Sequence, residues 1–139
     1  MPQFNGDNRM SKSKVISLIE EFSKLTFIGD RTPASTDEQL AGAFAQLAPY
    51  RDGAVFIGHY AGNSEWERHT QGDEIVYVLE GQTTLTFLSD NAEIPHLLQA
   101  GELIVVPQSV WHRFETPEGV KILSVTPAPT DHSLVKPIV

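Results

Sequence analysis

Residues 66–81 read "WERHTQGDEIVYVLEG" and place three potential metal ligands close together, Glu67, His69 and Glu74. Glu74 opens an apolar, strand-like run, after the turn-like residues "TQGD". Alternate residues of a strand face the same side, so Glu74 faces the interior if Val76 and Val78 do. Glu67 and His69 are two residues apart and can project from one face of a preceding strand. The stretch is therefore either a charged turn or one half of a metal site.

The chain around this stretch is typical of a β-rich fold. Short segments rich in β-branched and aromatic residues, bounded by Gly, Pro, Asp and Asn, predict strands at 53–62, 74–81, 83–90, 102–107, 111–116 and 120–127. Such regularly spaced strands with turn signals indicate an antiparallel sandwich or barrel. No helix is predicted between them, which argues against a parallel α/β sheet. We therefore expect a mainly all-β protein, a jelly-roll barrel with an N-terminal helical appendage.

Two helices are predicted before the first strand. Apolar residues between Lys14 and Leu25 recur at helical spacing and form one stripe. A second helix is expected from Asp37 to Leu47, with Ser35 and Glu38 as a capping box. The expected organisation is a disordered N-terminus at 1–12, a helical segment at 13–52, a barrel at 53–127 and an extended tail at 128–139. We expect the tail to pack along a sheet edge or onto a partner subunit.

Composition limits the partners and the ligands. The 139 residues include 18 acids and 10 bases, a net charge of −8, which argues against nucleic acid or an anionic membrane surface as a partner. There are no cysteines, so a metal must be held by His, Asp or Glu. The sequence has no apolar run of membrane-spanning length, and the start lacks the apolar core of a signal peptide. We expect a cytoplasmic protein.

A second half of the metal site is expected downstream, where residues 101–112 read "GELIVVPQSVWH" and end in His112. The first stretch follows the spacing Glu67-x-His69-x4-Glu74-x6-Gly, and the second follows Gly-x5-Pro-x-Ser109-x2-His112. Together they resemble the two motifs of the cupin superfamily. That resemblance implies a jelly roll, often dimeric, with one divalent metal inside the barrel mouth. It also implies that His69, Glu74 and His112 are metal ligands.

Three positions depart from the cupin pattern: Glu67 replaces the first histidine, Ser109 a glycine, and Thr116 the final asparagine. Glu67 matters most for the chemistry. As a fourth ligand it makes a divalent site electrically neutral; otherwise it is a catalytic base, or a surface acid paired with Arg68 or Arg113. Without Glu67, two histidines and one carboxylate leave open coordination positions, as in non-haem iron oxygenases. Such ligands suit Mn, Fe, Ni, Co or Zn.

Three functions remain open from the sequence. The first is a metal-dependent enzyme, a dioxygenase, isomerase or lyase, acting on a small organic molecule. The second is a non-catalytic module that binds a small ligand or metal as a sensor or stabilising protein. The third is a structural role in which the pocket is idle. In each case a homodimer is expected, because a small jelly roll exposes sheet edges that pairing would protect.

Overall fold

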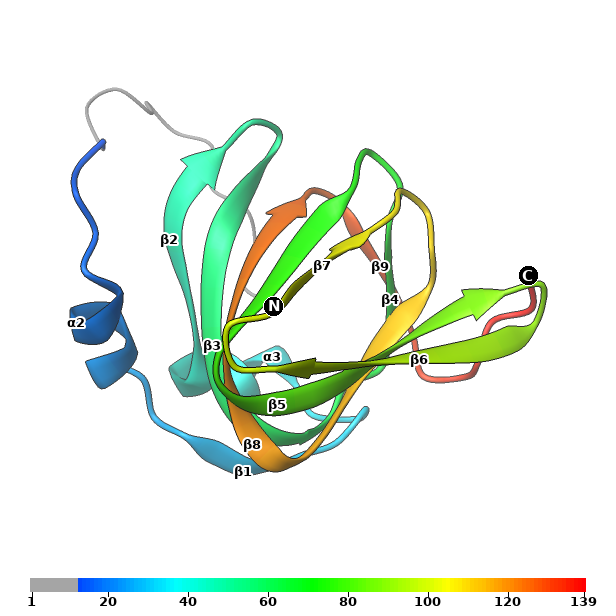
Figure 1. The fold of residues 1–139 in the computed structure, drawn as a ribbon, viewed down its shortest axis with the longest axis horizontal. Helices are drawn as coiled ribbons and strands as arrows, with labels where there is room; N and C mark the ends of the chain where they lie inside the picture. The colour runs from blue at the N-terminus through cyan, green and yellow to red at the C-terminus, as the bar shows by residue number, and fades with distance from the viewer. Residues whose placement is uncertain (1–12) are drawn as a thin grey trace.

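The structure is a computed structural model that describes residues 13–139, so the expectation of disorder at 1–12 lies outside the described residues. Its helical elements are α2 (Leu18–Ser23), α3 (Asp37–Leu40) and the 3₁₀ turn η1 (Ala41–Ala43). Its strands are β1 (Ile28–Arg31), β2 (Phe44–Tyr50), β3 (Gly53–Asn63), β4 (Trp66–His69), β5 (Glu74–Ser89), β6 (Ala92–Gln99), β7 (Leu103–Val106), β8 (His112–Pro127) and β9 (Thr130–Ser133). The mainly-β jelly roll predicted from the sequence is confirmed (Figure 1).

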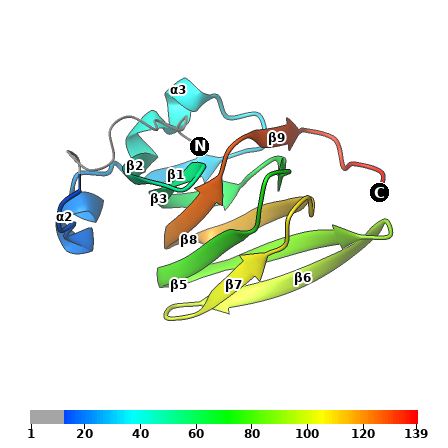
Figure 2. The same ribbon diagram turned by 90° about the horizontal axis from the view of Figure 1, so that it is seen from above.

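The nine strands of the described region are hydrogen-bonded into one sheet that curls around a common core. β8 is central, because it pairs antiparallel with β3, with β5 and, near its start, with β4. β6 and β7 pair with β5, and Figure 2 shows them on the far side of the molecule from α3. The interior is apolar around Val76 and Val78, both fully buried, which confirms the predicted inward face of the segment after Glu74.

β5 and β8 are each longer than the sequence indicates. The segments predicted at 74–81 and 83–90 form one strand. The pairing of β5 with β8 continues past Gly81 with a shift in register. Gly81 has a φ of 76°, and a Cβ atom at this position would lie 2.3 Å from the carbonyl oxygen of Gly119. The glycine therefore marks an irregularity within a continuous strand rather than a turn. The segments predicted at 111–116 and 120–127 likewise fuse into β8.

The first predicted helix is shorter than expected. It runs from Leu18 to Ser23 rather than from Lys14 to Leu25, and begins at a Ser17 cap. Of the residues in this helix only Phe22 is buried, and its ring lies beside Lys121 of β8, with Nζ 5.9 Å from the centroid. Among the described residues, Val15 and Ile19 of the apolar stripe are exposed, whereas Leu18 and Leu25 are half-buried. α2 lies on the outside of the barrel, beyond β2 (Figure 1).

The helix predicted from Asp37 to Leu47 is correct only for its first turn. α3 ends at Leu40, and its capping box is formed by Thr36 and Gln39, one residue later than predicted. After η1 the chain turns into β2, which pairs antiparallel with β3 from Phe44 onward. Strand pairing along β3 overrides the helical spacing of the apolar residues, and β1 also pairs with β3. Residues 13–52 therefore combine short helices with two strands of the barrel.

The C-terminal tail returns to the sheet. After the cis peptide bond between Ala128 and Pro129, β9 pairs antiparallel with β4. The chain then ends near the tip of the β5–β6 hairpin, where the Val139 N–H donates to Asn91 Oδ1 at 2.8 Å (Figure 1). Nowhere in residues 13–139 is there a helix of the length and apolarity needed to cross a membrane.

Candidate metal centre

Three of the four predicted ligands meet inside the barrel. His69 ends β4, Glu74 begins β5 and His112 begins β8, and all three side chains are buried. Glu74 Oε1 lies 3.3 Å from His69 Nε2 and 3.2 Å from His112 Nε2. One donor atom from each residue falls within 4.8 Å of the other two. The two sequence motifs therefore converge on one point, as expected.

The three converging atoms fit a metal ion better than they fit one another. Although the distances suit ion pairs, His69 Nε2, Glu74 Oε1 and His112 Nε2 all lack a hydrogen bond of acceptable geometry in residues 13–139. Buried polar atoms are rarely left unpaired, because desolvation without a partner is costly. Two imidazole nitrogens and a carboxylate oxygen are typical ligands of divalent transition metals. The donor set therefore fits a divalent cation.

Each ligand is held from behind by a second contact. Thr126 donates to Glu74 Oε2 at 2.6 Å, and Thr130 Oγ1 lies 3.0 Å from His69 Nδ1. His112 Nδ1 lies 2.9 Å from the carbonyl oxygen of Val110. A carbonyl only accepts, so this contact places the proton of a neutral His112 on Nδ1 and leaves the Nε2 lone pair for a metal.

The charges in this cluster are coupled. Burial opposes ionisation of Glu74, but the neighbouring His112 and His69 rings hold the pKa of its carboxyl far below the ordinary range. Burial alone would lower the pKa of His112, but the Glu74 carboxylate beside it raises that pKa above its ordinary value. The metal-free cluster therefore favours an ionised Glu74 and attracts positive charge, whether a proton or a metal.

Glu67 lies beside the cluster and not within the group of three. It is buried and sits directly across from His112 in the register between β4 and β8. The suggested surface pairings are wrong, because Arg68 pairs with Asp131 and Arg113 with Glu93. Glu67 faces the interior by strand alternation, on the same side as His69. Its role as fourth ligand or as base stays a prediction.

A small polar cavity adjoins Glu67. Its volume is about 20 Å³, room for about one water molecule, and its lining includes Glu67, Arg31 and His132. Arg31 is buried, with its guanidinium carbon 4.6 Å from the Tyr60 ring centroid and 5.1 Å from that of Phe44. Burial raises the pKa of Tyr60, and Glu67 adds to that effect while Arg31 opposes it. Nothing in the sequence around Arg31 indicated this position.

The other two departures from the cupin pattern are accommodated locally. Ser109 adopts a φ of 67°, the left-handed conformation that glycine adopts most easily, and its N–H donates to the His69 carbonyl oxygen at 2.8 Å. Thr116 is fully buried, and its hydroxyl lies 2.7 Å from that of Thr83. Neither substitution disturbs the three converging ligands.

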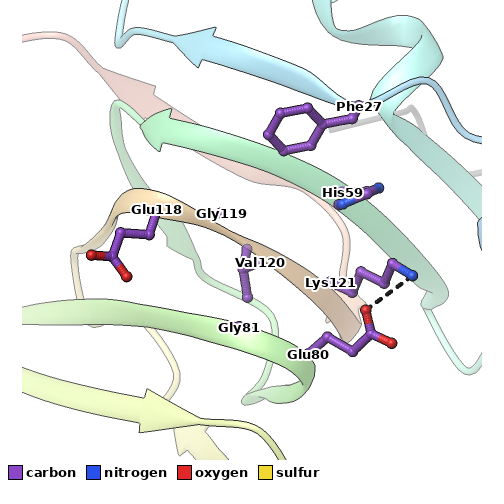
Figure 3. Close-up of a pocket in the computed structure, with 8 residues that line it drawn as sticks. All are labelled: Phe27, His59, Glu80, Gly81, Glu118, Gly119, Val120 and Lys121. Atoms are coloured by element: carbon purple, nitrogen blue, oxygen red, sulfur yellow. Dashed lines mark ion pairs between the residues drawn. The ribbon is translucent and has the colours of Figure 1, made fainter.

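A larger hollow of about 510 Å³ is separate from the metal cluster. Its lining combines residues of β3, β5 and β8 with Phe27, and none of the three cluster residues takes part (Figure 3). The Phe27 and His59 rings lie 4.8 Å apart, and Lys121 pairs with Glu80 at 3.0 Å. Burial, and to a lesser extent Lys121, lowers the pKa of His59. His59 therefore packs outside the metal centre.

The fold and the converging ligands define a cupin. The sequence profile of the cupin domain matches residues 57–126, and the chain belongs to this family. No curated protein sequence matches the chain.

Solved structures show the same fold. A cupin-2 domain containing protein from Shewanella frigidimarina is 25% identical, with a TM-score of 0.61 over 87% of this chain and 100% of that one. A hydroquinone 1,2-dioxygenase in complex with Cd²⁺ and 4-hydroxybenzonitrile is 21% identical, with a TM-score of 0.53 over 60% of this chain and 63% of that one. Bacillus subtilis oxalate decarboxylase, which has Mn(II) centres, is 21% identical, with a TM-score of 0.51 over 57% of this chain and 23% of that one.

Proposed function

We propose that the protein binds one divalent transition metal through His69, Glu74 and His112 and uses it to act on a small organic molecule. The observation that carries the proposal is the convergence of three buried donor atoms that have no hydrogen-bond partner in the described region. Three protein ligands leave coordination positions free for a substrate, which distinguishes catalytic metal sites from closed structural ones.

The protein's own residues supply binding and orientation. A bound divalent metal would polarise a carbonyl or enolate oxygen of the substrate, or activate dioxygen. Val110 and Thr126 keep His112 and Glu74 in the orientations that direct their free atoms to one point. Two neutral histidines and one carboxylate around a divalent ion leave a net charge of +1, which favours a substrate that binds as an anion.

We propose that Glu67 acts as a general base next to the metal and is not the fourth ligand. It is buried across from His112 but is not among the three groups whose donor atoms converge. It also lines the small cavity of about 20 Å³, which has room for about one water molecule, so water can reach its carboxylate. A general base must lie within hydrogen-bond reach of the proton that it removes from the substrate, and it does not need to bind the metal.

The reaction class we favour is that of a dioxygenase or a decarboxylase. The fold neighbours include a hydroquinone 1,2-dioxygenase and an oxalate decarboxylase, and their likeness to this chain is one of fold. Both substrates are small and present oxygen atoms that a metal can bind. For this chain we therefore expect a small substrate with oxygen atoms that can bind a metal, such as a dihydroxybenzene or a small dicarboxylate.

The test begins with metal loading. Protein supplied separately with Mn, Fe, Co, Ni or Zn is assayed for metal content, and then for oxygen consumption and carbon dioxide release with dihydroxybenzenes and small dicarboxylates. We expect one metal per chain and turnover that Glu67→Gln abolishes while metal content is kept. The Thr83→Val variant, altered at a buried hydroxyl outside the cluster, should keep both properties. A wild-type protein that binds none of these metals contradicts the proposal.

A non-catalytic binding module is the second candidate. The small volume of the cavity beside Glu67, about 20 Å³, favours a module that binds a metal alone, because organic ligands occupy pockets of several hundred Å³. In this case the metal-loaded protein shows no turnover, and Glu67→Gln lowers metal affinity because Glu67 is a ligand. The two candidates therefore differ in what the same variant does to metal content.

A further inference from the structure

We propose that the C-terminal strand β9 is part of the metal centre and that Thr130 is a positioning residue for the ligand His69. This inference rests on the proposed metal site and adds to it a segment that lies outside the two sequence motifs. β9 follows the cis peptide bond between Ala128 and Pro129 and runs antiparallel along β4.

The geometry places Thr130 directly behind the ligand. Thr130 and His69 are register partners, and Thr130 Oγ1 lies 3.0 Å from His69 Nδ1. The other ring nitrogen, Nε2, points to Glu74 Oε1 at 3.3 Å. When His69 is neutral and Nε2 binds a metal, the proton is on Nδ1 and the threonine oxygen accepts it. The hydroxyl can therefore accept the Nδ1 proton of the metal-binding tautomer, and the contact fixes the ring plane.

The strand that carries His69 depends on β9 for its place in the sheet. β4 has only four residues, and its register with β8 consists of the single pair Glu67 and His112. Every residue of β4, in contrast, has a register partner on β9. A ligand on a short strand is positioned only as well as that strand is held, so the docking of β9 affects the metal site.

Two side-chain contacts join β9 to the β4 region, one from Arg68 and one from Glu65, which precedes β4. Arg68 donates from Nε to Asp131 Oδ2 at 3.0 Å and pairs with the same oxygen through Nη2 at 3.0 Å. Its guanidinium also lies over the Trp111 ring, 4.7 Å from the centroid. His132 Nδ1 lies 2.6 Å from Glu65 Oε1, just before β4. These contacts tie β9 to the ligand strand, whereas Val139 at the end of the tail bonds Asn91 near the β5–β6 hairpin.

The experiment compares metal affinity among hydroxyl variants of the full chain, with Co²⁺ titrated by calorimetry and by its visible spectrum. Thr130→Val should weaken Co²⁺ binding about ten- to a hundredfold, the range for loss of a contact behind a metal ligand. Thr130→Ser keeps the hydroxyl and should restore affinity to within about threefold of wild type. Thr83→Val, the control, removes a buried hydroxyl that bonds Thr116 outside the cluster and should leave affinity unchanged.

Two further readouts separate this inference from the metal-site proposal. In the metal-free protein, nitrogen chemical shifts of His69 should differ between wild type and Thr130→Val, because the variant loses the contact at Nδ1. Binding is reciprocal, so Co²⁺ should also slow hydrogen exchange of the β9 amides. Should Thr130→Val fold poorly, Asp131→Asn, which loosens β9 without touching the ring, should weaken Co²⁺ binding as well.

Wild-type affinity in Thr130→Val, with unchanged β9 exchange on metal binding, would overturn the inference while the metal site stands. A wild-type protein that binds no Co²⁺ would overturn the metal site and this inference together.

Discussion

Replacing Thr126 with valine removes the hydroxyl that bonds Glu74 and that also lies 3.0 Å from Ser124 Oγ. The two side chains have nearly the same shape, so the change leaves no cavity. The Thr126 hydroxyl donates to Glu74 Oε2 at 2.6 Å, and both residues are buried, with exposed fractions of 5% and 3%. A hydrogen bond this short between a hydroxyl and a carboxylate is typical of the charge-assisted class.

The loss of stability expected for Thr126→Val follows from the strength of charge-assisted hydrogen bonds. Hydrogen bonds to charged groups contribute about 1.5–3 kcal/mol, and the buried Glu74 carboxylate gains no water to replace the lost donor. We therefore expect Thr126→Val to lower the free energy of unfolding of the metal-free protein by about 2 kcal/mol. For a domain of this size that is a decrease in Tm of about 7 °C.

The effect should depend on pH with a definite sign. The Glu74 pKa is lower in the folded protein than its ordinary value of 4.5, so the ionised carboxylate stabilises the fold above that pH. This contribution is lost as the pH falls towards the folded-state pKa. The difference between wild type and Thr126→Val should therefore be constant from neutral pH down to about 5 and shrink in more acidic solution.

Urea denaturation of the metal-free proteins across this pH range measures the difference. Thr126→Ser, which keeps the hydroxyl, is the matched control and should recover most of the lost stability. The reasoning is wrong if Thr126→Val is as stable as wild type at neutral pH, or if its deficit grows as the solution becomes acidic.

Three further predictions concern the cluster, the strand irregularity and the sheet edge. Because the pKa of His112 is raised and a metal needs its neutral form, Zn²⁺ affinity should fall as the pH is lowered from 8 to 6; calorimetry that shows no change contradicts this. Gly81→Ala should cost about 2 kcal/mol in urea denaturation, because a Cβ meets the Gly119 carbonyl; Gly101→Ala, also at a positive φ but in open space, should cost less. We also propose a homodimer through the outward face of β7, where Leu103 is 61% exposed on a strand whose only pairing partner in the described region is β5. An identical, uncharged face on a second copy would cover this edge, so Leu103→Lys should convert a dimer into a monomer in sedimentation velocity; a wild-type protein that sediments as a monomer refutes the proposal.

The convergence of His69, Glu74 and His112 could be expected from the sequence, partly from strand alternation and partly from the resemblance to the cupin motifs. The alternation after Glu74 sets the inward face of β5, and motif spacing selects His69 and His112. Thr126 was within reach of the same reasoning, because it shares the parity of the buried residues Ile122 and Ser124 on β8. Local periodicity thus explains which side chains enter the barrel.

The features that sequence reasoning missed depend on distant pairing. The apolar residues Phe44 and Leu47 have helical spacing, but this segment forms a strand because it pairs with the edge of β3. Thr130 reaches His69 only because the tail turns back along β4, and Arg31 is buried only because β1 joins the sheet beside β3. No pattern within these segments specifies the partner that each one meets, so their roles emerge from the three-dimensional structure.

Anomalous diffraction from crystals of the metal-loaded protein tests the central claim most directly. The account predicts one divalent ion bound by His69 Nε2, His112 Nε2 and a Glu74 carboxylate oxygen, at about 2.0–2.2 Å from each for zinc. It also predicts at least one coordination position held by solvent, with the Glu67 carboxylate near the ion but not bound to it. No ion at this point after loading, or an ion held by other residues, would contradict the account.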